Sequence, residues 1–125
     1  EARHVEPEAE VRRAARALAR FGAPENVVSA VRSLNKNDVV FMGQPPLRVD
    51  LMRSIDGVDP KAVFQQAVTT DLDGVRCRVI SLDHLITNKR ASGRPQDLID
   101  AAFLEKVRAQ TGRRKATHVA RKPRP

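Results

Sequence analysis

The 125-residue chain contains no tryptophan, no tyrosine and only four phenylalanines. Proteins that hold single-stranded nucleic acid by stacking need aromatic side chains as platforms, so this composition argues against that mode of binding. The hydrophobic core must instead be aliphatic. With a single cysteine, Cys77, the chain cannot form an internal disulfide.

Several local motifs are also missing. No stretch approaches the roughly 20 consecutive apolar residues of a membrane span, and no apolar segment typical of a signal peptide follows the N-terminus. The three histidines, His4, His84 and His118, lack the spacing of zinc ligands, and the six glycines stand singly, which excludes a glycine-rich phosphate loop. We therefore expect a cytoplasmic protein without a zinc site.

Positive charge is concentrated at the C-terminus. The formal net charge is +8, and residues 113–125 carry six lysines or arginines and no acid. Their low apolar content and two prolines predict a disordered basic tail, whereas residues 1–112 have the length of one folded domain. The tail either contacts RNA phosphates, with a steep salt dependence, or is a solvated extension without a function.

The hydrophobic pattern predicts helices that alternate with pairs of short strands. We expect helices over about 7–21, 24–34, 59–66, 81–92 and 95–110, and strands over about 39–42, 48–52, 68–72 and 75–80. This order indicates an α+β fold with a small mixed sheet of two strand pairs flanked by helices.

Particular residues support these elements. Asp59 and Ser81 stand where helix N-caps are expected, and the pair Asp73–Gly74 is a strong hairpin signal. The last helix has an apolar stripe, which we expect to face the core. Its members are Leu98, Ile99, Ala102, Phe103 and Val107.

Asp50 stands in the middle of a predicted strand, where aspartate is disfavoured. The simplest explanation is an ion pair with Arg48, which lies two residues away and therefore on the same face of the strand. The other explanation is that the carboxylate has a chemical function.

Two segments carry a resemblance that favours the chemical explanation. They are VDLMRSIDGVD at residues 49–59 and VISLDHLITNKRASGRPQDLID at residues 79–100. Together they resemble the second half of a bacterial nucleotidyltransferase-fold family that is related to minimal nucleotidyltransferases and to toxins of the AbiEii type. The similarity extends over about residues 20–107.

The resemblance implies a reaction and a set of residues. Members of the family transfer a nucleoside monophosphate from a nucleoside triphosphate to an RNA, protein or small-molecule acceptor, with Mg²⁺ held by three carboxylates. Asp50 would be the third of these metal-binding, catalytic carboxylates. Lys89 and Arg94 would contact the phosphates and neutralise the leaving pyrophosphate. Without a ligand, Lys89 also suits a helix C-terminus, and Asp97 suits the first turn of the next helix.

The other two carboxylates are not found. The family carries them in a Gly-Ser or Gly-Gly motif followed by Asp-x-Asp, and residues 1–49 contain neither. We therefore expect a fragment with an incomplete nucleotidyltransferase-like fold, inactive by itself. Either the full-length form is a nucleotidyltransferase, or the chain is a degenerate, non-catalytic member that binds nucleic acid or a protein, such as an antitoxin or a partner subunit that supplies the missing acids.

Overall fold

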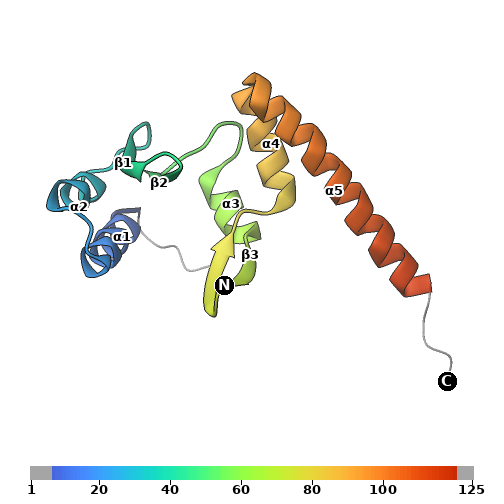
Figure 1. Cartoon of the computed structure of the whole chain (residues 1–125), viewed down its shortest axis with the longest axis horizontal. Helices are drawn as coiled ribbons and strands as arrows, with labels where there is room; N and C mark the ends of the chain where they lie inside the picture. The colour runs from blue at the N-terminus through green and yellow to red at the C-terminus, as the bar shows by residue number, and fades with distance from the viewer. Residues whose placement is uncertain (1–6, 121–125) are drawn as a thin grey trace. The chain divides into compact units, whose positions relative to one another are not determined.

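The computed structural model describes the backbone of residues 7–120 and the side chains of residues 8–112. Its elements, in chain order, are α1 (Pro7–Phe21), α2 (Glu25–Arg32), β1 (Val39–Gln44), β2 (Leu47–Met52), α3 (Pro60–Gln66), β3 (Val68–Leu72), β4 (Val75–Val79), α4 (Leu82–Ser92) and α5 (Pro95–Ala120) (Figure 1).

The chain divides into two compact units, Glu1–Ser54 and Ile55–Pro125. The first holds α1, α2 and the β1–β2 hairpin, and the second holds α3, the β3–β4 hairpin, α4 and α5. The α+β class is confirmed. The two strand pairs are separate two-stranded antiparallel sheets, however, and do not form the one small sheet expected within a single domain. The reason is that each strand pairs with its neighbour in sequence, and the two hairpins belong to different units.

The core of the first unit is made of small aliphatic side chains between α1 and α2. Ala15, Val28 and Val31 are fully or almost fully buried, and Val40 and Leu51 of the hairpin pack against them. Val11 and Ala15, four residues apart, thus form the buried face of α1, whereas Phe21 at its end is exposed. In Figure 1, α1 and α2 lie side by side, with the β1–β2 hairpin next to α2.

Local signals define the elements of the second unit. The Ser81 hydroxyl accepts a hydrogen bond from the backbone N–H of His84 at 3.2 Å, which caps α4 as predicted. Gly93 ends that helix in the left-handed conformation, with φ of 67°. Asp73 and Gly74 both have positive φ, as the tight turn between β3 and β4 requires.

Helices α4 and α5 pack against each other through few apolar residues. Ile86 and Ala101 are buried, and ion pairs cross between the helices on either side of them. These pairs join Lys89 to Asp97 and Asp100, Arg90 to Glu105, and Arg108 to Asp83.

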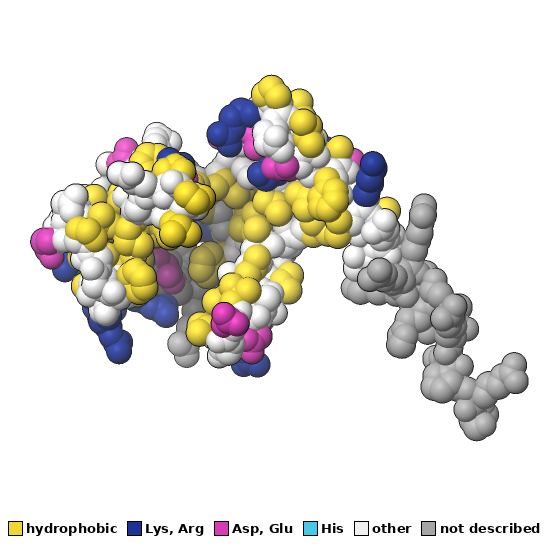
Figure 2. Space-filling model, in the orientation of Figure 1, with side chains coloured by type: hydrophobic (Ala, Val, Ile, Leu, Met, Phe, Trp, Pro, Cys, Tyr) yellow, Lys and Arg dark blue, Asp and Glu magenta, His cyan; other side chains and the backbone are white. Residues whose placement is uncertain are grey.

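The face of α5 that was expected to enter the core is exposed. Ile99 is 62% exposed and Phe103 is 65% exposed, and Leu98 is also open to solvent. The buried positions are Asp97 and Ala101 instead. The expectation was wrong because α5 turns its charged side, not its most apolar side, toward α4. Apolar side chains are accordingly visible at the surface of each unit (Figure 2).

Helix α5 is longer than predicted. Its backbone is helical through Ala120, so residues 113–120, assigned to a disordered tail from the sequence, are helical. The physical reason is that arginine, lysine and alanine are good helix formers and no proline occurs there before Pro123. Residues 121–125 lie outside the described part. None of the described helices combines the length and apolar composition needed to cross a membrane.

Candidate functional site

Asp50 lies on β2 opposite Phe41 of β1, on a solvent-accessible face of the hairpin. Its two carboxylate oxygens accept hydrogen bonds from Arg48, Oδ1 from Nε at 2.8 Å and Oδ2 from Nη2 at 3.2 Å. The guanidinium also lies over the Phe41 ring, 4.4 Å from its centroid. The ion pair with Arg48, expected as the simplest explanation of this aspartate, is therefore present.

The described residues do not form a metal centre around Asp50. Among them, no three His, Cys, Asp or Glu side chains come together in a way that could hold a metal ion. Both oxygens of Asp50 are already engaged by a cation. A divalent metal at this position would need to displace Arg48 and to recruit further oxygen ligands from elsewhere.

Lys89 and Arg94, in contrast, meet at one buried carboxylate. Asp97, in the first turn of α5, accepts a hydrogen bond from Arg94 Nε at 2.7 Å and lies 3.6 Å from Lys89 Nζ. Lys89 also donates to Oδ2 of Asp100 at 3.1 Å. The side chain of Asp97 is only 6% exposed, whereas that of Arg94 is 79% exposed. The two cations predicted from the sequence are therefore close together, and Asp97 holds them.

The same contacts change the proton affinities of this cluster. The hydrogen bond from Arg94 lowers the pKa of Asp97, and the nearby charges of Arg94 and Lys89 act in the same direction. Hydrogen bonds from Gln96 and Lys89 lower the pKa of Asp100. The bond to Asp97 in turn raises the pKa of Arg94. Asp97 and Asp100 are thus ionised and Arg94 is protonated near neutral pH.

Asp56, a residue that the sequence did not single out, joins the loop before α3 to helix α4, which carries Lys89. Its backbone carbonyl accepts a hydrogen bond from Asn88 Nδ2 at 3.0 Å, and its carboxylate accepts one from the Ser92 hydroxyl at 3.3 Å. The next residue, Gly57, has φ of 79° and approaches Ala91 so closely that any Cβ would clash. The sequence segment SIDGV contains this loop, but only the structure shows that the loop packs on α4.

The predicted site residues fall into two groups. Lys89, Arg94 and Asp97 are brought together in the second unit. Asp50 belongs to the first unit, where its described partner is Arg48.

Comparison with known proteins identifies a family. A protein-family model described as "Nucleotidyl transferase of unknown function (DUF2204)" matches residues 28–122. The matched region includes both groups of predicted site residues and leaves out α1. No curated protein and no solved structure matches the chain.

Proposed function

The chain belongs to the family of nucleotidyl transferases of unknown function, and from this membership we propose that it takes part in transferring a nucleoside monophosphate from a nucleoside triphosphate to an RNA, protein or small-molecule acceptor. The observation that carries the proposal is the convergence of Lys89 and Arg94 on Asp97 inside the matched region. In such a transfer an acceptor oxygen bonds to the α-phosphorus, and pyrophosphate leaves with the electrons of the broken P–O bond.

Lys89 and Arg94 would bind the phosphates that leave. Arg94 uses Nε for Asp97, and its side chain is largely exposed, so a phosphate can approach the outer edge of the guanidinium. Lys89 is held between two carboxylates, which fix the position of a second cationic hydrogen-bond donor. Positive charge placed where negative charge develops is the usual means by which proteins promote phosphoryl chemistry.

Asp50 is proposed as one ligand of a Mg²⁺ site that needs two further carboxylates from another segment or from a partner subunit. The described residues alone do not fit such a site, as the Arg48 contact and the lack of a metal cluster among them indicate. By this proposal the 125-residue chain is inactive until those carboxylates are present. Four statements stay predictions: the closer likeness to AbiEii-type toxins, an antitoxin partner, RNA contact through the basic tail, and a cytoplasmic location.

The ion pair between Arg48 and Asp50 also supports a second, non-catalytic function. Because Arg48 engages both oxygens of Asp50, the chain would also suit a degenerate member of the family that binds nucleic acid or a protein without catalysis. In that case the ion pair stabilises the hairpin, and no nucleotide is consumed.

The test measures transfer of label from each of the four nucleoside triphosphates to total RNA and protein, with Mg²⁺, using the protein at the length its gene encodes. Asp50→Asn should abolish transfer, whereas Arg48→Gln, which breaks the same ion pair but leaves the carboxylate, should retain it. Equal losses in the two variants would assign Asp50 a structural role only. Absence of transfer with every triphosphate would favour the non-catalytic function.

The phosphate contacts are tested in the same assay. Arg94→Gln should lower the rate on the order of a hundredfold, as loss of a preorganised charge at a phosphate does. Arg108→Gln is the matched control, because Arg108 also pairs with one aspartate, Asp83, in the same helix pair. Similar effects of the two substitutions would mean that Arg94 acts through folding.

A further inference from the structure

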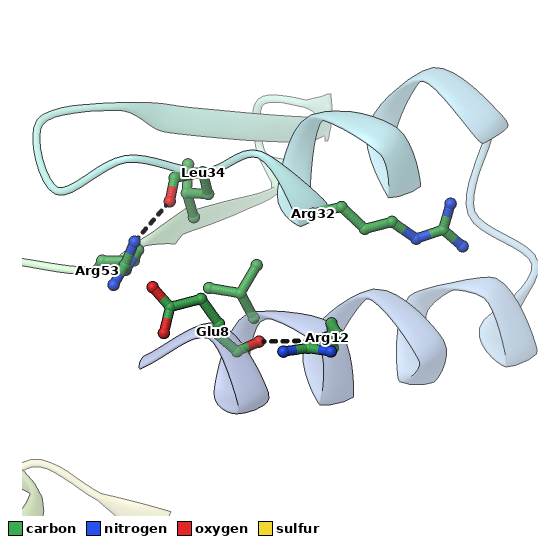
Figure 3. Close-up of a pocket in the computed structure, with 6 residues that line it drawn as sticks. Glu8, Arg12, Arg32, Leu34 and Arg53 are labelled. Atoms are coloured by element: carbon green, nitrogen blue, oxygen red, sulfur yellow. Dashed lines mark hydrogen bonds between the residues drawn. The ribbon is translucent and has the colours of Figure 1, made fainter. Parts of the chain in front are cut away.

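The first unit contains a hollow of about 370 Å³ between α1, the end of α2 and the end of β2 (Figure 3). Its size lies within the range of small-molecule sites, which is roughly 300–1,000 Å³. Three arginines and one acid contribute to the lining. The lining residues are Glu8, Val11, Arg12, Arg32, Leu34 and Arg53.

The three arginines come from separate parts of the first unit, and two of them bond to backbone carbonyls. Arg12 Nε donates to the backbone carbonyl of Glu8 at 3.3 Å, and Arg53 Nη1 donates to that of Leu34 at 2.9 Å (Figure 3). A carbonyl oxygen orients a guanidinium without cancelling its charge. Arg32, in the last turn of α2, forms no ion pair with a carboxylate among the described residues, and its guanidinium extends away from Glu8 and Arg53 (Figure 3).

This arrangement differs from that of other arginines in the chain. Arg48 and Arg108 each pair with an aspartate within 3 Å. At the hollow, Glu8 is the only acid among the lining residues, so the lining carries more positive than negative charge. Like charges that line one hollow repel each other, and an anionic ligand would reduce this repulsion.

We propose that this hollow binds a phosphate ester. Guanidinium groups match the geometry of phosphate oxygens and can bind them in pairs. Val11 and Leu34, both buried, give the hollow an apolar part that suits the organic portion of an ester better than inorganic phosphate. The phosphate could come from a free nucleotide or from a nucleic-acid strand. Glu8, Val11 and Arg12 precede the matched residues 28–122, so the site goes beyond what family membership assigns.

The test uses the 125-residue chain without Mg²⁺ and three probes: inorganic phosphate, ATP and a fluorescein-labelled single-stranded RNA of about a dozen nucleotides. Calorimetry measures the first two and fluorescence anisotropy the third. Arg12→Gln and Arg53→Gln should each weaken ester binding about tenfold or more, the effect of losing a charge-assisted hydrogen bond. Arg16→Gln is the matched control, since it removes the same charge from α1 at a position outside the lining.

The variant Glu8→Gln distinguishes a direct effect on ligand binding from a loss of folded structure. Removing this carboxylate should tighten binding several-fold, a change that loss of packing would not produce. Binding of RNA but not ATP would identify a strand as the source of the phosphate, and ATP binding would identify a nucleotide. Four outcomes would each overturn the proposal. Arg12→Gln and Arg16→Gln could lose binding equally, or Glu8→Gln could bind more weakly or without change. Inorganic phosphate could bind as tightly as the esters, or no probe could bind. No transfer is measured, so failure of the proposed enzymatic function leaves this result unaffected.

Discussion

Asp97 accepts a hydrogen bond from Arg94 Nε at 2.7 Å, and the carboxylate is nearly buried while its partner is mostly exposed. Lys89 approaches the other oxygen of the same carboxylate at 3.6 Å. One aspartate in the first turn of α5 therefore positions two cations, one from α4 and one from the residue before α5. Its removal would leave two positive charges close together.

We predict that the ionised Asp97 makes the stability of the second unit depend on acid pH. The pKa of Asp97 is lowered in the folded protein from an ordinary value of 3.8. The contribution of ionised Asp97 to stability is therefore complete when the pH is above that ordinary value. It is lost as the pH falls through the lowered pKa that Asp97 has in the folded protein. Urea unfolding followed by circular dichroism between pH 6 and pH 2 should show a smaller loss of stability in Asp97→Asn than in the wild type. Parallel pH profiles would contradict the prediction.

We predict that Ile86 and Ile99 differ sharply in their contribution to stability, although the side chains are identical. Ile86 is 1% exposed in α4, so Ile86→Ala should cost about 2–5 kcal/mol. Ile99 is mostly exposed, so Ile99→Ala should change the free energy of unfolding by no more than about 0.5 kcal/mol. Because the chain lacks tryptophan and tyrosine, circular dichroism at 222 nm is the suitable signal. A comparable loss in both variants would mean that the outer face of α5 is covered in solution.

We predict that only one of the two N-caps expected from the sequence stabilises its helix. The Ser81 side chain accepts from His84 N, so Ser81→Ala should destabilise α4 by about 0.5–2 kcal/mol. Asp59 makes no capping hydrogen bond from its side chain, and Asp59→Ala should cost less than about 0.5 kcal/mol. Hydrogen exchange in the first turns of α3 and α4 measures both effects. If Asp59→Ala accelerated hydrogen exchange in α3 as much as Ser81→Ala accelerates it in α4, the distinction between the two caps would be refuted.

The positions and ends of most elements were predictable because they depend on neighbours in sequence. Ser81 caps α4, Gly93 ends it, and Asp73 with Gly74 turns the second hairpin, all as expected. The pair between Arg48 and Asp50 was predictable for the same reason, since residues two apart in a strand share a face.

The tertiary structure alone decided which surfaces are buried and which charged groups meet. The rotation of α5 about its axis depends on its packing against α4, which exposes Ile99 and buries Asp97. The hydrogen bonds from Asn88 and Ser92 to Asp56 join residues far apart in sequence. The hollow in the first unit does the same, since Arg12 and Arg53 both line it. Composition and local spacing determined the helices, strands and turns because backbone preference is a property of neighbouring residues. The sites depend on how those elements pack, which no local pattern specifies.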